Sequence, residues 1–308
     1  MNPNAPVGKF THHLIRQHMA QYSIRDLEQL SGIKAHTIRI WEKRHQLISP
    51  QRTDTNIRLY SDEDLKRIIN ISLLNTRGFK ISKIASMSDG EIHQQVTLLS
   101  EQHEEAEIHI DQLIIAMVEL DEEKFEKILL TLILRYKLER TITEIIYPFM
   151  EKIGVLWQTG NILPAQEHFI ANLIRQKLIV AIDAIPFPPA SAHRLMLFLP
   201  EKEQHEIALL FFHYIAKKEG YRTYYLGQSV PFDDLVSVYN THHPSVMITN
   251  ITYMPSVQLY LDKLSEHFPE CKILVSGFAL RKKSLQYGPQ VQFFDKSLEL
   301  KDLLSIPS

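Results

Sequence analysis

The sequence predicts a multidomain protein in which helical units precede an α/β unit with a doubly wound parallel sheet. Its 308 residues fit two or three units of about 100 to 150 residues each. Residues 89–184 contain little Gly or Pro and keep the helical period of 3.6 residues. After residue 190, apolar runs alternate with helical stretches, which is typical of an α/β unit. A proline-rich linker at residues 186–189 separates the two regions.

The first unit is expected at residues 20–88, after a flexible arm at residues 1–19 that shows no periodicity. Ser23 is a predicted N-cap for a helix that ends near Gly32, and a second short helix should cover residues 35–44. Turn residues within 45–60 favour a two-stranded wing over a helix.

A third helix of this unit should begin at Ser61, which precedes three acidic residues, and should end before Gly78. One more short helix is predicted at residues 80–87. The following region, residues 89–185, is broken near Asp121, near Arg140 and at residues 161–164. These breaks predict four helices that form a bundle, placed as a cap before the last unit.

The C-terminal unit, residues 190–308, is predicted to be Rossmann-like. Strands are expected at residues 194–199, 222–226, 245–251 and 272–276. They alternate with helices expected at residues 204–219, 231–241, 255–268 and 295–304.

Composition narrows the class of protein further. Residues 1–83 hold 14 Lys and Arg against 7 Asp and Glu, whereas the remaining residues hold 20 against 29. This segregation suits a basic module that neutralises phosphates, joined to an acidic one. The single Cys271 excludes an intrachain disulfide, and its expected role is that of a small buried hydrophobe. The sequence shows neither a membrane span nor a signal peptide, so a cytoplasmic location is expected.

The basic module carries a motif typical of DNA binding. A helix in the major groove needs side chains that face base edges, flanked by cations for phosphates. The second helix begins with Lys34, His36 and Thr37 and continues with Arg39, Lys43 and Arg44. The stretch from Tyr22 to Tyr60 resembles the MerR-type winged helix-turn-helix, which implies double-stranded promoter DNA as partner. The resemblance implies that Arg39, Arg44 and the wing residues contact the DNA backbone, that Trp41 packs and that Glu42 organises arginines; the wing residues are Arg52, Arg58 and Tyr60.

Trp41 and the arginines also have ordinary structural readings. A large aromatic residue in so short a helix is expected to serve the domain core. For the arginines, the alternative to phosphate contact is a solvated basic face.

A second set of residues indicates a cobalt site. Glu203-x-His205-x-x-Ala208 follows the first predicted strand, where an imidazole can ligate cobalt and a carboxylate can hold its other ring nitrogen. The motif resembles the Asp-x-His-x-x-Gly motif of base-off, His-on cobalamin-binding domains, in which the histidine is the lower cobalt ligand. By the same resemblance, small residues leave a channel for the nucleotide tail of the cofactor; here these positions hold Ala208, Thr249 in Thr249-x-Ile251, Ser276 and Gly277.

The helical region adds a match to the other face of the cofactor. Trp157, followed by Glu167 and His168, resembles the helical cap of MerR-type adenosylcobalamin photoreceptors, the CarH and LitR-like regulators. In that family the three side chains surround the adenosyl face. Ala208 and Ser276 add atoms where the family favours glycine, which narrows the tail channel. Gln158 stands where some light sensors have a histidine.

These resemblances imply a DNA-binding repressor, a dimer or tetramer, whose oligomerisation and DNA affinity respond to adenosylcobalamin and light. Two alternatives stay open. One is a MerR-type repressor whose degenerate cobalamin domain needs no cofactor. The other is a corrinoid carrier or enzyme, which is disfavoured because the chain lacks a Gly-rich phosphate loop and a Gly-x-Ser-x-Gly elbow.

Overall fold

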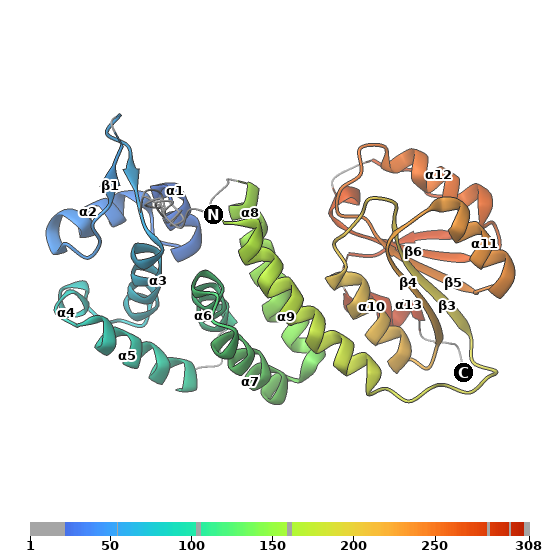
Figure 1. Cartoon of the computed structure of the whole chain (residues 1–308), viewed down its shortest axis with the longest axis horizontal. Coiled ribbons are helices and arrows are strands. Elements are labelled where there is room, and N and C mark those ends of the chain that lie inside the picture. The colour runs from blue at the N-terminus through green and yellow to red at the C-terminus, as the bar shows by residue number, and fades with distance from the viewer. Residues whose placement is uncertain are drawn as a thin grey trace, which may run out of the picture. The chain divides into compact units, whose positions relative to one another are not determined.

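A computed structural model describes residues 22–53, 55–102, 106–158, 162–281, 284–295 and 297–304. The arm expected at residues 1–19 lies outside these ranges. Within them, the structure describes the backbone of Trp157 and Gln158 but not their side chains. The chain forms two compact units that divide between Glu167 and His168, inside one helix (Figure 1).

The N-terminal part of the first unit is a helix-turn-helix with a wing. Its elements are α1 (Ile24–Ser31), α2 (Ala35–His45), β1 (Gln51–Arg52), β2 (Arg58–Leu59), α3 (Asp62–Thr76) and α4 (Ile81–Ala85). Both predicted N-caps are confirmed, because Ser23 and Ser61 each form a capping box with the aspartate three residues later. Gly32 ends α1 in the left-handed conformation (φ 71°), and β1 pairs antiparallel with β2, as the two-stranded wing requires.

The helices that follow differ in number from the prediction. They are α5 (Asp89–Gln102), α6 (Ala106–Glu119), α7 (Glu122–Thr141), the π-helical segment η1 (Ile142–Ile146), α8 (Tyr147–Gln158) and α9 (Pro164–Asp183). The break at Asp121 is confirmed, since its side chain accepts from the Lys124 N–H and caps α7.

One expectation about this region is wrong: a single helix across residues 89–120 is instead two, and α5 packs against α3 of the winged helix-turn-helix part. The break near Arg140 is confirmed three residues earlier, where Lys137 has a non-helical backbone (φ 65°, ψ 159°) and separates two helical parts of α7. The second part continues through η1 into α8. The four predicted helices are therefore five α-helices in the described part of residues 89–183.

The second unit contains the predicted parallel sheet. The strands β3 (Arg194–Pro200), β4 (Arg222–Val230), β5 (Val246–Asn250) and β6 (Lys272–Ser276) confirm the four expected runs; β7 (Val291–Phe293) was not predicted. All neighbouring pairs are parallel, in the order β4-β3-β5-β6-β7. The strand order reverses between β3 and β5, and ligands bind at the carboxyl ends of strands at such a switch point.

Helices cover both faces of this sheet (Figure 1). They are α10 (Ile207–Lys218), α11 (Phe232–His242), α12 (Val257–His267) and α13 (Ser297–Leu304), with the 3₁₀ turn η2 (Phe278–Leu280) after β6. Helices α11 and α12 share a core with Phe198, Met247 and Ile273, while α10 contacts α13. The sheet is thus a doubly wound layer whose carboxyl edge is shaped by the loops after β3, β5 and β6.

Candidate functional site

Helix α2 presents one exposed polar face. His36, Arg39, Lys43 and Arg44 are exposed, whereas Ile38 and Trp41 are buried, with 0% and 8% of their surface exposed. Positions 36, 39, 43 and 44 repeat at helical spacing, so they share a face opposite the core. The packing expected for Trp41 is therefore present, and the four predicted side chains are brought together.

The start of α2 is fixed by Glu28 of α1. Its carboxylate accepts from the Ala35 N–H at 3.1 Å and pairs with the Lys34 Nζ at 3.1 Å. These hydrogen bonds lower the pKa of Glu28. Thr37, in the first turn of α2, is half-buried and lies on the same helix as the exposed cations. Glu28 thus holds the beginning of α2 to α1, a role that its position in the sequence does not reveal.

Glu42 joins the wing to α2. Its two carboxylate oxygens accept from the Arg58 Nε at 3.2 and 3.1 Å, and one of them accepts from the Tyr60 hydroxyl at 3.3 Å. Tyr60 is only 1% exposed, so its ring lies in the domain core and holds Glu42 rather than facing solvent. Arg58 is half-buried, whereas Arg52 is exposed and donates to Asn56 at 2.5 Å. Among the predicted wing contacts, Arg52 is the most accessible to a phosphate.

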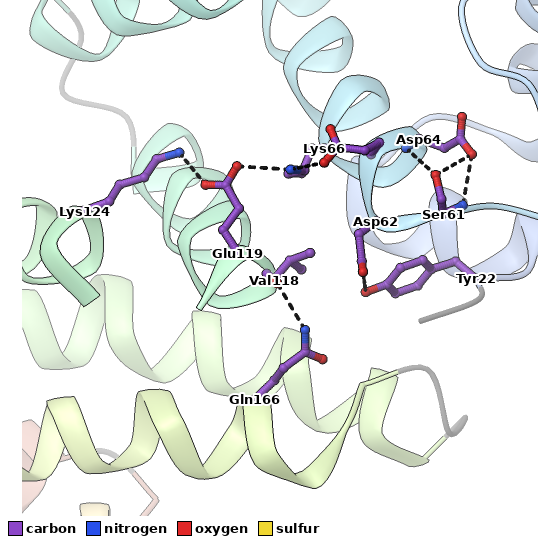
Figure 2. Close-up of polar contacts among 10 residues, drawn as sticks. Tyr22, Ser61, Asp62, Asp64, Lys66, Val118, Glu119, Lys124 and Gln166 are labelled. Atoms are coloured by element: carbon purple, nitrogen blue, oxygen red, sulfur yellow. Dashed lines mark hydrogen bonds and ion pairs between the residues drawn. The ribbon is translucent and has the colours of Figure 1, made fainter. Parts of the chain in front are cut away.

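Lys66 links the DNA-binding part to the next helices (Figure 2). Its Nζ on α3 lies 2.6 Å from Glu63 and 3.1 Å from Glu119, and Glu119 also pairs with Lys124 at 3.0 Å. The predicted sites did not include this set, because Lys66 and Glu119, which join its two halves across the α3–α6 contact, are 53 residues apart in the chain.

Gln166 fixes the beginning of α9 (Figure 2). Its side chain is 4% exposed, accepts from the Leu163 N–H at 3.1 Å and donates to the Val118 carbonyl at 3.3 Å. Glu167, which is half-buried, and His168, which is exposed, follow directly. A Gln three residues after the N-cap is half of a capping box, and this signal could have identified it from the sequence.

At the carboxyl edge of the sheet, Glu203 holds His205 and the loop after β5. Its Oε1 lies 2.5 Å from the His205 Nδ1, and its Oε2 accepts from the backbone N–H of Thr252 and Tyr253 at 2.8 and 3.2 Å. Burial favours a raised pKa for Glu203, but hydrogen bonds from the His205 ring and backbone and from Thr252 and Tyr253 lower that pKa to about 2. An ionised carboxylate therefore orients the imidazole.

The donor set fits a cobalt ion on the ring's other nitrogen. With Nδ1 held by Glu203, the tautomer directs Nε2 toward a metal, and the His205 side chain is 63% exposed. In the adjacent strand, the buried Thr249 hydroxyl has no hydrogen-bond partner among the described residues. An unsatisfied buried hydroxyl at a strand end suits a polar ligand group.

Gly277 is explained by the chain itself. A Cβ at this position would lie 2.2 Å from the Ile251 carbonyl oxygen, and its φ is 123°. The Ile251 N–H donates to the Ser276 carbonyl at 2.8 Å, which brings the loops after β5 and β6 together. Close backbone contact therefore requires glycine here, apart from any effect on a tail channel.

Six of the predicted cofactor residues thus gather at one edge of the sheet unit: Glu203, His205, Ala208, Thr249, Ser276 and Gly277. Ala208 is half-buried in the first turn of α10, and Ser276 is 6% exposed. The other three lie on α8 and α9: Trp157, Glu167 and His168. The described residues contain no helix long and apolar enough to span a membrane. They also contain no cluster of three His, Cys, Asp or Glu suited to a metal ion.

Comparisons with known proteins match two regions of the chain. Residues 22–91 match the MerR HTH family regulatory protein, and residues 109–181 match the B12 binding domain. The chain joins a MerR DNA-binding domain to a B12-binding domain. The B12 match covers helices α7 and α8 and most of α6 and α9, so these helices belong to the part of the chain that matches a B12-binding domain.

Two curated relatives match over most of their length. The chain is 26% identical to the HTH-type transcriptional repressor CarH of Myxococcus xanthus, over 70% of this chain and 73% of CarH. It is 24% identical to the HTH-type transcriptional repressor CarA of the same organism, over 84% of this chain and 87% of CarA. The chain is thus homologous to transcriptional regulators that are named as repressors.

A solved structure supports the fold of the cofactor-binding part. The Methanosarcina barkeri monomethylamine corrinoid protein matches with a TM-score of 0.52 at 15% identity, over 64% of this chain and 97% of that protein. At this identity the match shows that the two chains share a fold, and the predicted Rossmann-like unit is confirmed.

Proposed function

We propose that this chain is a transcriptional repressor that binds promoter DNA as a homo-oligomer and is controlled by adenosylcobalamin and light. The observation that carries the proposal is the Glu203–His205 pair at the sheet's switch point, in a chain that also has an exposed basic recognition helix. The proposed domains are the winged helix-turn-helix at residues 20–88, the helical cap at 89–185 and the Rossmann-like cobalamin-binding domain at 190–308. The chain has no assigned catalytic residue, and regulation by a bound ligand accounts for both sites without turnover.

The DNA-binding step follows from the charge and exposure of α2. Arg39, Lys43 and Arg44 lie on the exposed face, so they can reach phosphates and base edges while Trp41 anchors the helix. Arg52 on the wing adds a further cation. A titration of promoter DNA at several salt concentrations tests this step, because affinity must fall steeply as salt rises. Absence of binding, or binding that salt does not weaken, would refute it.

The sensing step depends on His205 and its surroundings. Glu203 fixes the ring tautomer, and His205 is proposed as the lower cobalt ligand. Trp157, Glu167 and His168 are proposed to contact the adenosyl face. When bound, the cofactor supplies a cobalt–carbon bond that light can break. The protein can respond only through different affinities of its states for the intact cofactor.

One experiment tests the sensing step. Purified protein is titrated with adenosylcobalamin in the dark, then examined by absorbance and size-exclusion chromatography before and after green light. A red stoichiometric complex whose size changes with light supports the proposal, and His205→Ala should abolish the change in spectrum.

A colourless protein of unchanged size would refute cofactor control. The DNA-binding step would then stand alone, as in a repressor whose cobalamin domain is degenerate. Ala208 and Ser276, which are larger than glycine, are the observation that favours this second function. Turnover of a corrinoid substrate without DNA retention would instead indicate a carrier or an enzyme.

A further inference from the structure

Glu206, the residue after His205, makes a contact that the cobalamin motif does not include. It occupies the N-cap position of α10 and is 8% exposed. Its Oε2 lies 2.8 Å from the Arg175 guanidinium on α9, and its Oε1 accepts from the Tyr225 hydroxyl on β4 at 2.8 Å. A single buried carboxylate therefore connects the His205 loop to a helix and to a strand.

Tyr225 is itself held in place from the other side. Its ring stacks on His213 with a centroid separation of 4.8 Å, and the His213 Nε2 lies 2.9 Å from the Thr223 hydroxyl. Burial and the Glu206 carboxylate raise the pKa of Tyr225, so its hydroxyl remains a donor. The strand side of the Glu206 contact is thus rigid.

The helix side of the contact has a different character. Arg175 and Glu206 approach within ion-pair distance, yet the Arg175 Nε and the Glu206 Oε2 make no well-angled hydrogen bond. The Arg175 Nε takes no part in the contact, so the pair is not a side-on bidentate fork. A carboxylate that is this buried is costly to leave without its cation, so movement of Arg175 must affect Glu206.

The Arg175–Glu206 pair lies next to the proposed cobalt ligand His205 in the chain. Glu203, two residues before His205, holds the loop to the backbone after β5. Glu206, the residue after His205, holds the same loop to α9 and β4. On α9, His168 stands seven residues before Arg175, which is two helical turns, so both lie on one face of the helix.

We propose that Glu206 is a positioning residue for His205, and that the Arg175–Glu206 ion pair couples the lower-ligand loop to α9, the helix that carries His168. This inference rests on the proposed binding of a corrinoid cobalt by His205. A cobalt bond to His205 fixes the loop and therefore the place of Glu206. Arg175 then transmits that position to α9, and a displacement of α9 acts on His205 in reverse.

The test uses the full chain and cobinamide, a corrinoid that lacks the nucleotide tail. Because cobinamide brings no nitrogen base of its own, nitrogen splitting in the electron paramagnetic resonance spectrum of its reduced, cobalt(II) form reports a protein ligand. His205→Ala assigns that ligand. Arg175→Met, Glu206→Gln and Tyr225→Phe each remove one part of the contact.

Arg175→Met and Glu206→Gln are expected to weaken cobinamide binding about 10-fold or more, as loss of a residue behind a metal ligand does. They should also reduce the fraction of spectra with nitrogen splitting. Arg175→Lys, which restores the charge, should recover part of both. The matched control is Lys217→Met, since Lys217 makes a separate polar contact between α10 and α9, to the Ile182 carbonyl at 3.0 Å. It should leave splitting and affinity unchanged.

The outcomes separate the two proposals. If the unaltered protein neither binds cobinamide nor shows splitting, the proposed cobalamin function fails. If it binds with splitting and the Arg175 and Glu206 variants match it, the ion-pair coupling alone is overturned. Should Arg175→Met lose its far-ultraviolet circular dichroism, Tyr225→Phe, which removes one hydroxyl, decides the question: unchanged splitting and affinity would then overturn the role of Glu206.

Discussion

Asp111→Asn should change the pH dependence of stability of the first unit. Asp111 on α6 is 8% exposed, and its carboxylate accepts from the Lys152 Nζ of α8 at 2.8 Å. Burial raises the pKa of Asp111 to about 6, although Lys152 acts to lower it; the Glu107 charge raises it further. The pair lines a cavity of about 740 Å³ that also contacts Trp41 of the DNA-binding helix.

The size of the effect follows from the pKa difference. The ordinary value is 3.8 and the folded value is about 6, a difference of about 2.2. At about 1.4 kcal/mol for each pKa unit, ionising Asp111 costs the folded state about 3 kcal/mol. The folded pKa of Asp111 is raised, so protonated Asp111 favours the folded state. The free energy of unfolding is therefore highest below pH 3.8 and falls as the pH rises from 3.8 through about 6.

The assay is urea unfolding followed by tryptophan fluorescence between pH 4 and pH 8. The chain has two tryptophans, Trp41 and Trp157, and both belong to the first unit, so the signal reports that unit. Stability of the unaltered protein minus that of Asp111→Asn should fall by about 2.4 kcal/mol from pH 4 to pH 7, because part of the roughly 3 kcal/mol is already lost at pH 4. The buried His109 titrates in both proteins and cancels in the difference.

Glu123→Gln, a change at an exposed position on α7, is the control and should give a nearly flat difference. A difference for Asp111→Asn that rises with pH would show that the ionised pair with Lys152 stabilises the fold. That result would refute the reasoning from burial.

Three further predictions concern the two sites. Arg39→Ala and Lys43→Ala should each weaken DNA binding for all sequences and reduce the slope of log affinity against log salt by about 1; Lys127→Ala, an exposed change on α7, should do neither. Glu42→Gln removes the charge that holds Arg58 and Tyr60, and should lower stability in urea unfolding by about 1 kcal/mol. Gly277→Ala should lower the stability of the sheet unit by about 2 kcal/mol or more in circular dichroism melts, since its Cβ meets the Ile251 carbonyl at 2.2 Å. Unchanged melting of Gly277→Ala would contradict the steric argument.

Local signals predicted much of the fold. Ser23 and Ser61 were identifiable as caps because a capping box needs residues only three positions apart. The runs that became β3 to β6 are apolar along their whole length, as buried parallel strands must be. The strand β7 has three residues and lacks such a run, so it was not predicted.

The site was predictable to the same extent. Glu203 and His205 are two residues apart, and their resemblance to the Asp-x-His-x-x-Gly motif predicted their contact. The N–H donors of Thr252 and Tyr253 lie 49 and 50 residues further on and meet Glu203 only because β3 and β5 are neighbours in the sheet. The burial of Tyr60 likewise depends on its bridge to Tyr22, 38 positions earlier in the chain, which no local pattern contains.

Helix α9 has contacts in both units, which bears on how a ligand could affect DNA binding. At the start of α9, the Gln166 side chain donates to the Val118 carbonyl of α6. Glu119, which follows Val118, pairs with Lys66 of α3 (Figure 2). Nine residues after Gln166, in the second unit, Arg175 pairs with Glu206 beside His205. Contiguity of this kind permits coupling without demonstrating it, because coupling requires that both sites bias the same two states.

The coupling is measurable as the ratio of DNA affinities with and without adenosylcobalamin in the dark. If α9 carries it, Arg175→Met and Lys66→Ala should each reduce that ratio, and the double variant should reduce it no further than the larger single effect, because both changes interrupt one path. Lys217→Met should keep the full ratio. Additive losses would instead mean that the Arg175 and Lys66 contacts act independently, and the link through α9 would then have to be abandoned even if both sites bind their ligands.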